Sequence, residues 1–302
     1  MSHLIALIFV LASAYIGSAI FSLLLGIILA YCINLPDNFI TKKIGSKFIQ
    51  IGIILLAFSI PIYEAFEITK LFIPSIAVFV VSILLLGFII GKFFNLKRNE
   101  IVLITSGTAI CGATAIAAIA PIVKASPKSL VISISLVFLF NAFALIAFPL
   151  IGNYFGMSQD FFGAWVALSI HDTASVLGAA LSFGNESVDM ATTIKLTRTL
   201  WLIPLMIALS IFYDRKTSFK MPIFVLIFLS VLFLNSYLFI DATTLLFIDN
   251  VSNLFLFSGL FCIGTSINKQ SMLSLNHRVI FHALILWVIA ILLSYILVSY
   301  VL

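Results

Sequence analysis

Long apolar runs separated by short polar stretches make up almost the whole chain. A membrane-spanning helix needs about 20 predominantly apolar residues, and continuous runs favour helices over the alternating strands of a barrel. We therefore predict an all-α polytopic membrane protein of about 11 transmembrane helices, forming a single transporter domain over residues 1–302. The predicted segments are 3–16, 17–34, 48–63, 71–91, 100–121, 127–151, 160–183, 190–212, 221–240, 251–268 and 279–301. Segments 3–16 and 48–63 are short, so the sequence leaves open whether they cross fully.

The composition excludes several classes of protein. Hydrophobic residues make up 63% of the chain and charged residues 9%, against roughly 25% charged residues in soluble domains. The polar stretches are too short for a catalytic or nucleotide-binding domain, and no Gly-rich phosphate loop is present. We expect no enzyme activity, cofactor or metal. The net charge of +5 is explained by basic loops, so we expect a lipid bilayer and not a nucleic acid as the partner.

The charged loops predict an orientation. Lys and Arg accumulate in short cytoplasmic loops, and four basic loops fall on one side of an eleven-span chain: 35–47, 92–100, 213–220 and 269–278. Acidic residues gather on the other side, and only Lys124 and Lys128 disagree. We predict a multi-pass protein of the bacterial inner membrane with a cytoplasmic N-terminus and an external C-terminus.

Segment 100–121 carries small and hydroxylated residues at its middle, among them Gly107, Thr108, Gly112 and Thr114. Such residues allow close helix packing, but they also suit a discontinuous helix, whose half-helix ends carry partial charges at mid-membrane. Segment 251–268 contains a weaker echo in Cys262-Ile-Gly264-Thr265. If five-helix repeats run over 17–151 and 160–301, each of these two segments is the fourth span of its repeat. An odd number of spans per repeat would place these repeats in inverted orientation.

Apart from residues at the first two positions of a segment, the predicted spans contain five Asp, Glu, His, Lys or Arg residues: His171, Asp172, Lys195, Arg198 and His282. Even on a lenient scale, a charge in hydrocarbon costs about 2.5–3.5 kcal/mol, so such residues should face a cavity or one another. Lys195 and Arg198 are three residues apart and share a helix face. One hypothesis is an ion pair between Asp172 and Lys195 or Arg198 that pins two helices. The other is a polar site for a substrate or a coupling ion, and we favour it. His282 is expected near the membrane interface.

These residues carry a resemblance to a known family. Gly107 to Ala125 (with Cys111-Gly112 and Pro121), Ser169 to Ala180 (with His171-Asp172) and Lys195-Leu-Thr-Arg198 follow one another here as in the YeiH-type putative sulfate exporters of bacterial inner membranes, which the chain resembles from about residue 17 to its end. Many relatives have Glu at the position of Asp172 and Gln near Ser175. The family looks related to the bile-acid and sodium–proton transporters, which implies inverted repeats, two crossing broken helices and elevator-type motion. By resemblance, 100–121 and 251–268 are the broken helices.

We therefore expect a secondary active transporter that exports a small anion such as sulfate or sulfite, coupled to protons or sodium, and forming a homodimer. One alternative is a cation–proton antiporter in which Asp172 is the ion-binding carboxylate. The other is a structural membrane protein without transport. The expected substrate-binding residues are Thr108, Cys111, Gly112, Thr114, His171, Asp172, Ser175, Lys195, Arg198, Gly264 and Thr265.

Overall fold

The computed structural model describes residues 2–33, 39–58, 62–213, 223–235, 237–238, 240–265 and 277–302. Within these ranges the regular structure is helical, and no strand occurs. The helices are α1 (Ser2–Ile16), α2 (Ala19–Ile33), α3 (Ile40–Leu56), α4 (Ile62–Phe93), α5 (Arg98–Ala109), α6 (Ala113–Ile119), α7 (Pro127–Tyr154), α8 (Gln159–Ser169), α9 (Thr173–Phe183), α10 (Asn185–Thr199), α11 (Leu202–Phe212), α12 (Ile223–Asn235), α13 (Ala242–Gly264) and α15 (His277–Ser299).

Five helical stretches in the described part of the chain are long and apolar enough to cross a membrane. They are Ile62–Phe93, Ile132–Tyr154, Asn185–Phe212, Thr243–Gly264 and His277–Ser299. The all-helical class and the apolar spans are thus as predicted, whereas the count of about 11 spans and the inverted repeats stay predictions. The predicted segments 3–16 and 17–34 match α1 and α2 closely.

Several predicted boundaries are wrong because amphipathic turns extend the apolar runs. Helix α3 begins at Ile40 and not at residue 48, so Lys42, Lys43 and Lys47 lie on a helix and not in a loop. Helix α4 begins nine residues earlier than predicted and includes Glu64 and Glu67. A run of polar residues therefore does not end a helix where one face remains apolar.

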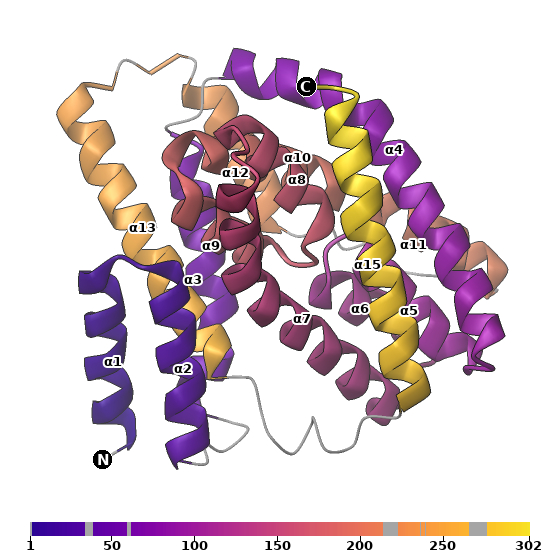
Figure 1. Ribbon diagram of the computed structural model, residues 1–302. Helices are drawn as coiled ribbons and strands as arrows, with labels where there is room; N and C mark the ends of the chain where they lie inside the picture. The colour runs from indigo at the N-terminus through magenta and orange to yellow at the C-terminus, as the bar shows by residue number, and fades with distance from the viewer. Residues whose placement is uncertain are drawn as a thin grey trace.

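Two groups of helices make up the fold (Figure 1). In the outer group, α13 packs against α1, α2 and α3. The second group contains the interrupted helix pairs α5/α6 and α8/α9, and we call it the crossing group. In it, α10 packs against α4, α8 and α9, and α15 packs against α4 and α8. Contacts between the groups are fewer and involve mainly α9 with α2 and α13. Helix α12 lies between them, touching α3 and α4.

Glycines allow the outer group to pack closely. A Cβ atom added at Gly26 of α2 would meet the Phe261 carbonyl of α13 and would lie 3.0 Å from the Gly264 Cα. On α3, a Cβ at Gly45 would lie 2.7 Å from the Cys262 Cβ. Small residues let helix backbones approach this closely without a side chain between them. The Cys262–Gly264 motif is therefore a packing surface of a continuous helix.

The structure assigns the helix breaks differently from the sequence. The predicted break within 100–121 is confirmed, because α5 ends at Ala109 and α6 begins at Ala113. The predicted break within 251–268 is wrong for the described residues, since α13 runs without interruption to Gly264; residues 266–268 lie outside the described part. A break that the sequence did not predict separates α8 from α9 at residues 170–172.

Candidate functional site

The break between α5 and α6 depends on Gly112. Its φ of 60° and ψ of −125° match the first central position of a type II′ turn, which glycine dominates. A Cβ at this position would lie 3.0 Å from Val137 Cγ1 and 3.2 Å from the Cβ of His171. Both the backbone conformation and the available space therefore require glycine. Because His171 belongs to the break between α8 and α9, the two broken helices contact each other at their interruptions. We call this region the crossing.

The break between α8 and α9 is made by an extended residue followed by a helix cap. Ile170 has φ −85° and ψ 144°, which ends α8, and Asp172 is the N-cap of α9. The Asp172 carboxylate accepts a hydrogen bond from the Ser175 backbone N–H at 2.6 Å and another from the Ser175 hydroxyl at 3.3 Å. Aspartate is among the preferred N-cap residues, and its negative charge favours the positive end of a helix.

Arg198 lies across the ends of α5 and α8 where these helices stop. Its Nε donates to the Ala109 carbonyl at 2.9 Å, and its Nη2 donates to the Thr108 carbonyl. Its Nη1 donates to the carbonyls of Leu168 at 2.7 Å and Ala167 at 3.0 Å. The four last carbonyls of a helix have no partner within it. A single guanidinium from α10 thus satisfies carbonyls at the C-terminal ends of two half-helices.

Lys195 adds a second cation one turn away on the same helix. Its Nζ donates to the Ile170 carbonyl at 2.7 Å, directly after α8. Both Lys195 and Arg198 are fully buried, at 0% exposure, and Phe79 of α4 covers the guanidinium at 4.7 Å from its ring centre. Cations are favourable at helix C-termini, where each helix carries about half a negative charge. The two predicted anion-binding residues therefore stabilise the broken helices.

The direct ion pair that we considered from the sequence does not form. The hydrogen bonds of Lys195 and Arg198 go to backbone carbonyls, and those of Asp172 go to Ser175 and Asn141. The charges of Lys195 and Asp172 nevertheless act on each other across the crossing. The two cations of α10 are thus held by carbonyls at the ends of α5 and α8, and Asp172 is held by the start of its own helix and by Asn141.

Asn141, on α7, connects the breaks through both ends of its amide. Its Oδ1 accepts from the His171 backbone N–H at 3.2 Å, and its Nδ2 donates to Asp172. Because a backbone N–H can only donate, this contact fixes which end of the amide is oxygen. The same Oδ1 lies 3.2 Å from His171 Nδ1, so that nitrogen must carry a proton. His171 Nε2 lies 3.2 Å from the Thr108 hydroxyl; in the neutral ring it accepts from that hydroxyl.

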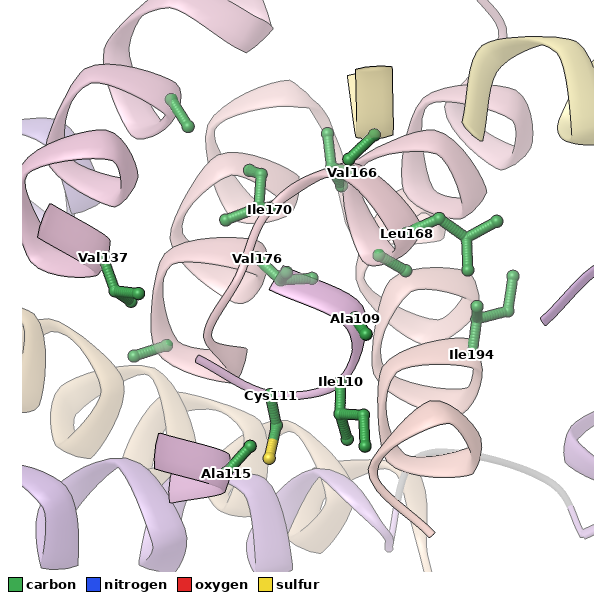
Figure 2. Close-up of a cluster of buried hydrophobic side chains, with 14 of the residues drawn as sticks. Ala109, Ile110, Cys111, Ala115, Val137, Val166, Leu168, Ile170, Val176 and Ile194 are labelled. Carbon is green, nitrogen blue, oxygen red and sulfur yellow. The ribbon is translucent and has the colours of Figure 1, made fainter. Parts of the chain in front are cut away.

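The crossing is not sealed on every side. Cys111, Ser175, Lys195 and Arg198 are buried, whereas Asp172 is partly exposed and Thr114 on α6 is exposed. Most other exposed positions of the spans are large and apolar, as expected for contact with lipid. The partly exposed Asp172 on α9 and the exposed Thr114 on α6 are therefore the polar side chains of the crossing that a ligand from outside could reach. Figure 2 shows the apolar side chains around the two breaks, including Ile110, Cys111 and Ile170.

The structure separates the eleven predicted site residues into two sets. Nine lie at or beside the crossing: Thr108, Cys111, Gly112, Thr114, His171, Asp172, Ser175, Lys195 and Arg198. The other two belong to the outer group. There the Thr265 hydroxyl lies 2.6 Å from the Thr41 hydroxyl of α3, and Gly264 packs against α2. The shared Cys-Gly-Thr pattern suggested one site, but a pattern of small residues is equally suited to helix packing.

Asn141 was not among the predicted site residues. His282, which we expected near the membrane interface, is fully buried in the protein, with its Nε2 2.9 Å from the Gly87 carbonyl. One signal was available: Asp172-Thr-Ala-Ser175 has an N-cap residue three positions before a partner, which places a helix start in the middle of segment 160–183. No group of three or more His, Cys, Asp or Glu that could hold a metal occurs in the described ranges.

Comparison with known proteins identifies relatives over most of the chain. The sequence model of a family described as "Conserved hypothetical protein 698" matches residues 1–283. A UPF0324 membrane protein of Porphyromonas gingivalis is 38% identical over 82% of this chain and 77% of its own length. One from Bacteroides thetaiotaomicron is 35% identical over 89% and 82%, and one from Vibrio vulnificus is 34% identical over 89% and 88%. No solved structure matches the chain.

Proposed function

This chain belongs to the conserved hypothetical protein 698 family of membrane proteins, and we propose that it is a secondary active transporter of a small anion. The anion binds at the crossing of α5/α6 with α8/α9, and its transport is coupled to protonation of Asp172. We also propose that the protein lies in the bacterial inner membrane. There it alternates access to the two sides by an elevator-type motion.

The charge balance of the crossing carries this proposal. The crossing contains two buried cations, Lys195 and Arg198, and one carboxylate, Asp172. The crossing also contains two half-helix C-termini and two half-helix N-termini, each carrying about half a charge of opposite sign, so these contributions cancel. About one positive charge remains when Asp172 is ionised and His171 is neutral. A charge surplus in a medium of low dielectric is costly, and a bound anion offsets it.

Coupling to protons follows from the same balance. Protonation of Asp172 removes the only carboxylate at the crossing and increases the positive surplus by one charge. Anion binding and proton binding therefore favour each other, and the coupling is reciprocal because both act on one equilibrium. Asp172 is suited to this role because it is the only one of the four ionisable side chains at the crossing that is partly exposed.

The two helix groups support alternating access. The outer group is packed through glycines and through hydrogen bonds such as Ser252 to the Gly52 carbonyl at 2.8 Å. The crossing group is held separately by the backbone contacts of Arg198. Each group is thus well packed internally, while few contacts join them. Movement of the crossing group along the outer group would carry the site across the membrane without disrupting the contacts between the two broken helices.

The resemblance to the YeiH-type putative sulfate exporters and to the bile-acid and sodium–proton transporters suggests the first substrates to test. An oxyanion such as sulfate or sulfite can accept a hydrogen bond from the exposed Thr114 hydroxyl of α6. Thr114 donates a hydrogen bond readily.

One observation favours a second candidate, a cation–proton antiporter. The accessible charge at the crossing is a carboxylate, while both cations are buried and engaged with carbonyls. A cation that reached Asp172 would compete with a proton for the same oxygen atoms. This alternative predicts that cations, and not anions, drive proton movement.

The experiment is uptake of radiolabelled sulfate and sulfite into proteoliposomes, with and without an imposed proton gradient. We expect gradient-driven uptake that is lost in Asp172→Asn, because asparagine can still cap α9 but cannot exchange a proton. Asp160→Asn is the matched control, since Asp160 is an exposed aspartate in the first turn of α8. Equal gradient-driven uptake by wild type and Asp172→Asn would reject the coupling role.

A further inference from the structure

A cavity of about 310 Å³ lies between α4, α10 and α12, outside the crossing. Most of its walls are apolar, and they include Ala65 and Phe66 of α4 together with Leu232 and Phe233 of α12. Phe66 and Phe233 are 62% and 54% exposed, so the cavity opens to the surface that faces lipid. Its position beside α12 places it between the crossing group and the outer group.

Threonine hydroxyls interrupt the apolar wall on one side. Thr69 and Thr197 lie 3.2 Å apart and satisfy each other. Thr193 differs from its neighbours on α10: Thr192, Thr197 and Thr199 each donate to the carbonyl four residues earlier, but the Thr193 hydroxyl has no hydrogen-bond partner. Thr193 is 5% exposed and lines the cavity. A buried polar group without a partner costs about 1–3 kcal/mol, so this hydroxyl indicates a ligand that accepts a hydrogen bond.

One end of the cavity is acidic. Asp189 precedes Thr193 by four residues and therefore lies on the same face of α10, about 6 Å closer to the helix start. The charges of Glu64 on α4 and Asp249 on α13 act on Asp189. Asp189 of α10 and Glu64, the neighbour of the cavity-lining Ala65 on α4, thus lie toward the end of the cavity at which these two helices begin. Along α10, the acidic side chain of Asp189 comes first, the unpaired hydroxyl of Thr193 follows, and the apolar part of the cavity comes last.

We propose that this cavity binds one phospholipid with a primary-amine headgroup. An acyl chain fills the space between α4, α10 and α12, an ester carbonyl accepts a hydrogen bond from Thr193, and the ammonium lies beside Asp189 and Glu64. The sequence of groups on a phospholipid, from ammonium through ester to hydrocarbon, matches the order along α10. A lipid seated here contacts the crossing group and α12, which in turn touches α3 of the outer group, so it is positioned to affect the relative movement of the two groups.

Native mass spectrometry of the detergent-purified chain, titrated with phosphatidylethanolamine or phosphatidylglycerol of equal chain length, tests the proposal. We expect wild type to retain phosphatidylethanolamine at least tenfold better than phosphatidylglycerol. Ala65→Phe, which fills the cavity, should lose both lipids. The double variant Asp189→Asn with Glu64→Gln should keep the lipid but lose the preference. If Ala65→Phe fails to fold, the double variant and Thr193→Val, which weakens retention of both lipids, decide the outcome.

Two matched controls complete the test. Glu186→Gln removes an exposed acidic side chain from the same helix, and Leu85→Phe enlarges an exposed apolar side chain of α4 that is not part of the cavity. Both should retain lipid as wild type does. Equal retention of the two lipids by wild type, or unchanged retention by Ala65→Phe, would overturn the proposal.

Discussion

The Nε of Arg198 donates a hydrogen bond to the carbonyl of Ala109, the last residue of α5, at 2.9 Å. The two residues are 89 positions apart in the chain. The same guanidinium reaches the end of α8, so one side chain from α10 closes two half-helices that stop within the membrane-spanning region. This relationship explains how the crossing tolerates irregular backbone, because the carbonyls without a partner in their own helix are hydrogen-bonded by the protein.

The first prediction concerns the stability of the crossing. Arg198→Ala should lower the free energy of unfolding by roughly 3 kcal/mol or more, because each buried polar group left without a partner costs about 1–3 kcal/mol. The measurement is the melting temperature in detergent. Arg98→Ala, at an exposed arginine that begins α5, is the control and should change little. An unchanged melting temperature in Arg198→Ala would mean that the guanidinium does not hold the half-helices.

Asn141 provides a second test of the same architecture. Asn141→Leu leaves the His171 backbone N–H without its acceptor and Asp172 without one of its donors. We expect a loss of about 1–3 kcal/mol of stability, measured by chemical unfolding in detergent. Asn153→Leu, at the exposed end of α7, should be close to wild type. Equal effects of the two substitutions would argue against the connecting role of Asn141.

Gly112 and Gly156 form a matched pair of glycines with positive φ. Both have φ of 60°, but a Cβ at Gly156 would meet nothing within 4 Å, whereas one at Gly112 would press on Val137 and His171. Gly156→Ala should cost about 1 kcal/mol for the backbone alone. Gly112→Ala should cost more, since a strained backbone costs roughly 1–3 kcal/mol before the contacts are counted. The comparison of melting temperatures decides this point, and a smaller loss in Gly112→Ala would contradict it.

The open side of the crossing can be detected by thiol labelling. In a Cys32→Ser background, Thr114→Cys should react with a charged methanethiosulfonate reagent, because Thr114 is an exposed polar residue on α6, directly after the first break. Cys111 and Cys262 are buried and should not react. Leu85→Cys, exposed on an apolar face, serves as a control for lipid contact and should react poorly. Equal reactivity at positions 114 and 85 would show that Thr114 faces lipid and not water.

The sequence predicted the parts of this fold that depend on local composition. Apolar length identified the spans, and Gly107, Gly112 and Thr114 identified the break in 100–121, because glycine at mid-span weakens a helix where it stands. The second break was not predicted, since Asp172 and Ser175 were interpreted as binding residues. The capping signal Asp172-Thr-Ala-Ser175 was present, but it lies inside a continuous apolar run that is long enough to be a single span.

Nine of the eleven residues that the sequence singled out lie at or beside one crossing, but the roles of its charges could not be derived from sequence. Lys195 and Arg198 were recognised as buried cations that need partners. Their partners are backbone carbonyls of Thr108, Ala109 and Ile170, and every residue has a carbonyl, so no residue type signals such contacts. Gly264 and Thr265 were misplaced for the opposite reason, because a small-residue motif fits both a broken helix and a tight helix crossing.

The central claim is that anion binding and protonation of Asp172 favour each other. The most direct measurement is the pH change when sulfate or sodium is added, each at matched pH and ionic strength, to lightly buffered, detergent-purified protein. We predict that sulfate causes proton uptake, approaching one proton per chain, and that Asp172→Asn abolishes it while sodium has no effect. Proton release on addition of sodium, lost in Asp172→Asn, would contradict the anion transporter and identify a cation–proton antiporter.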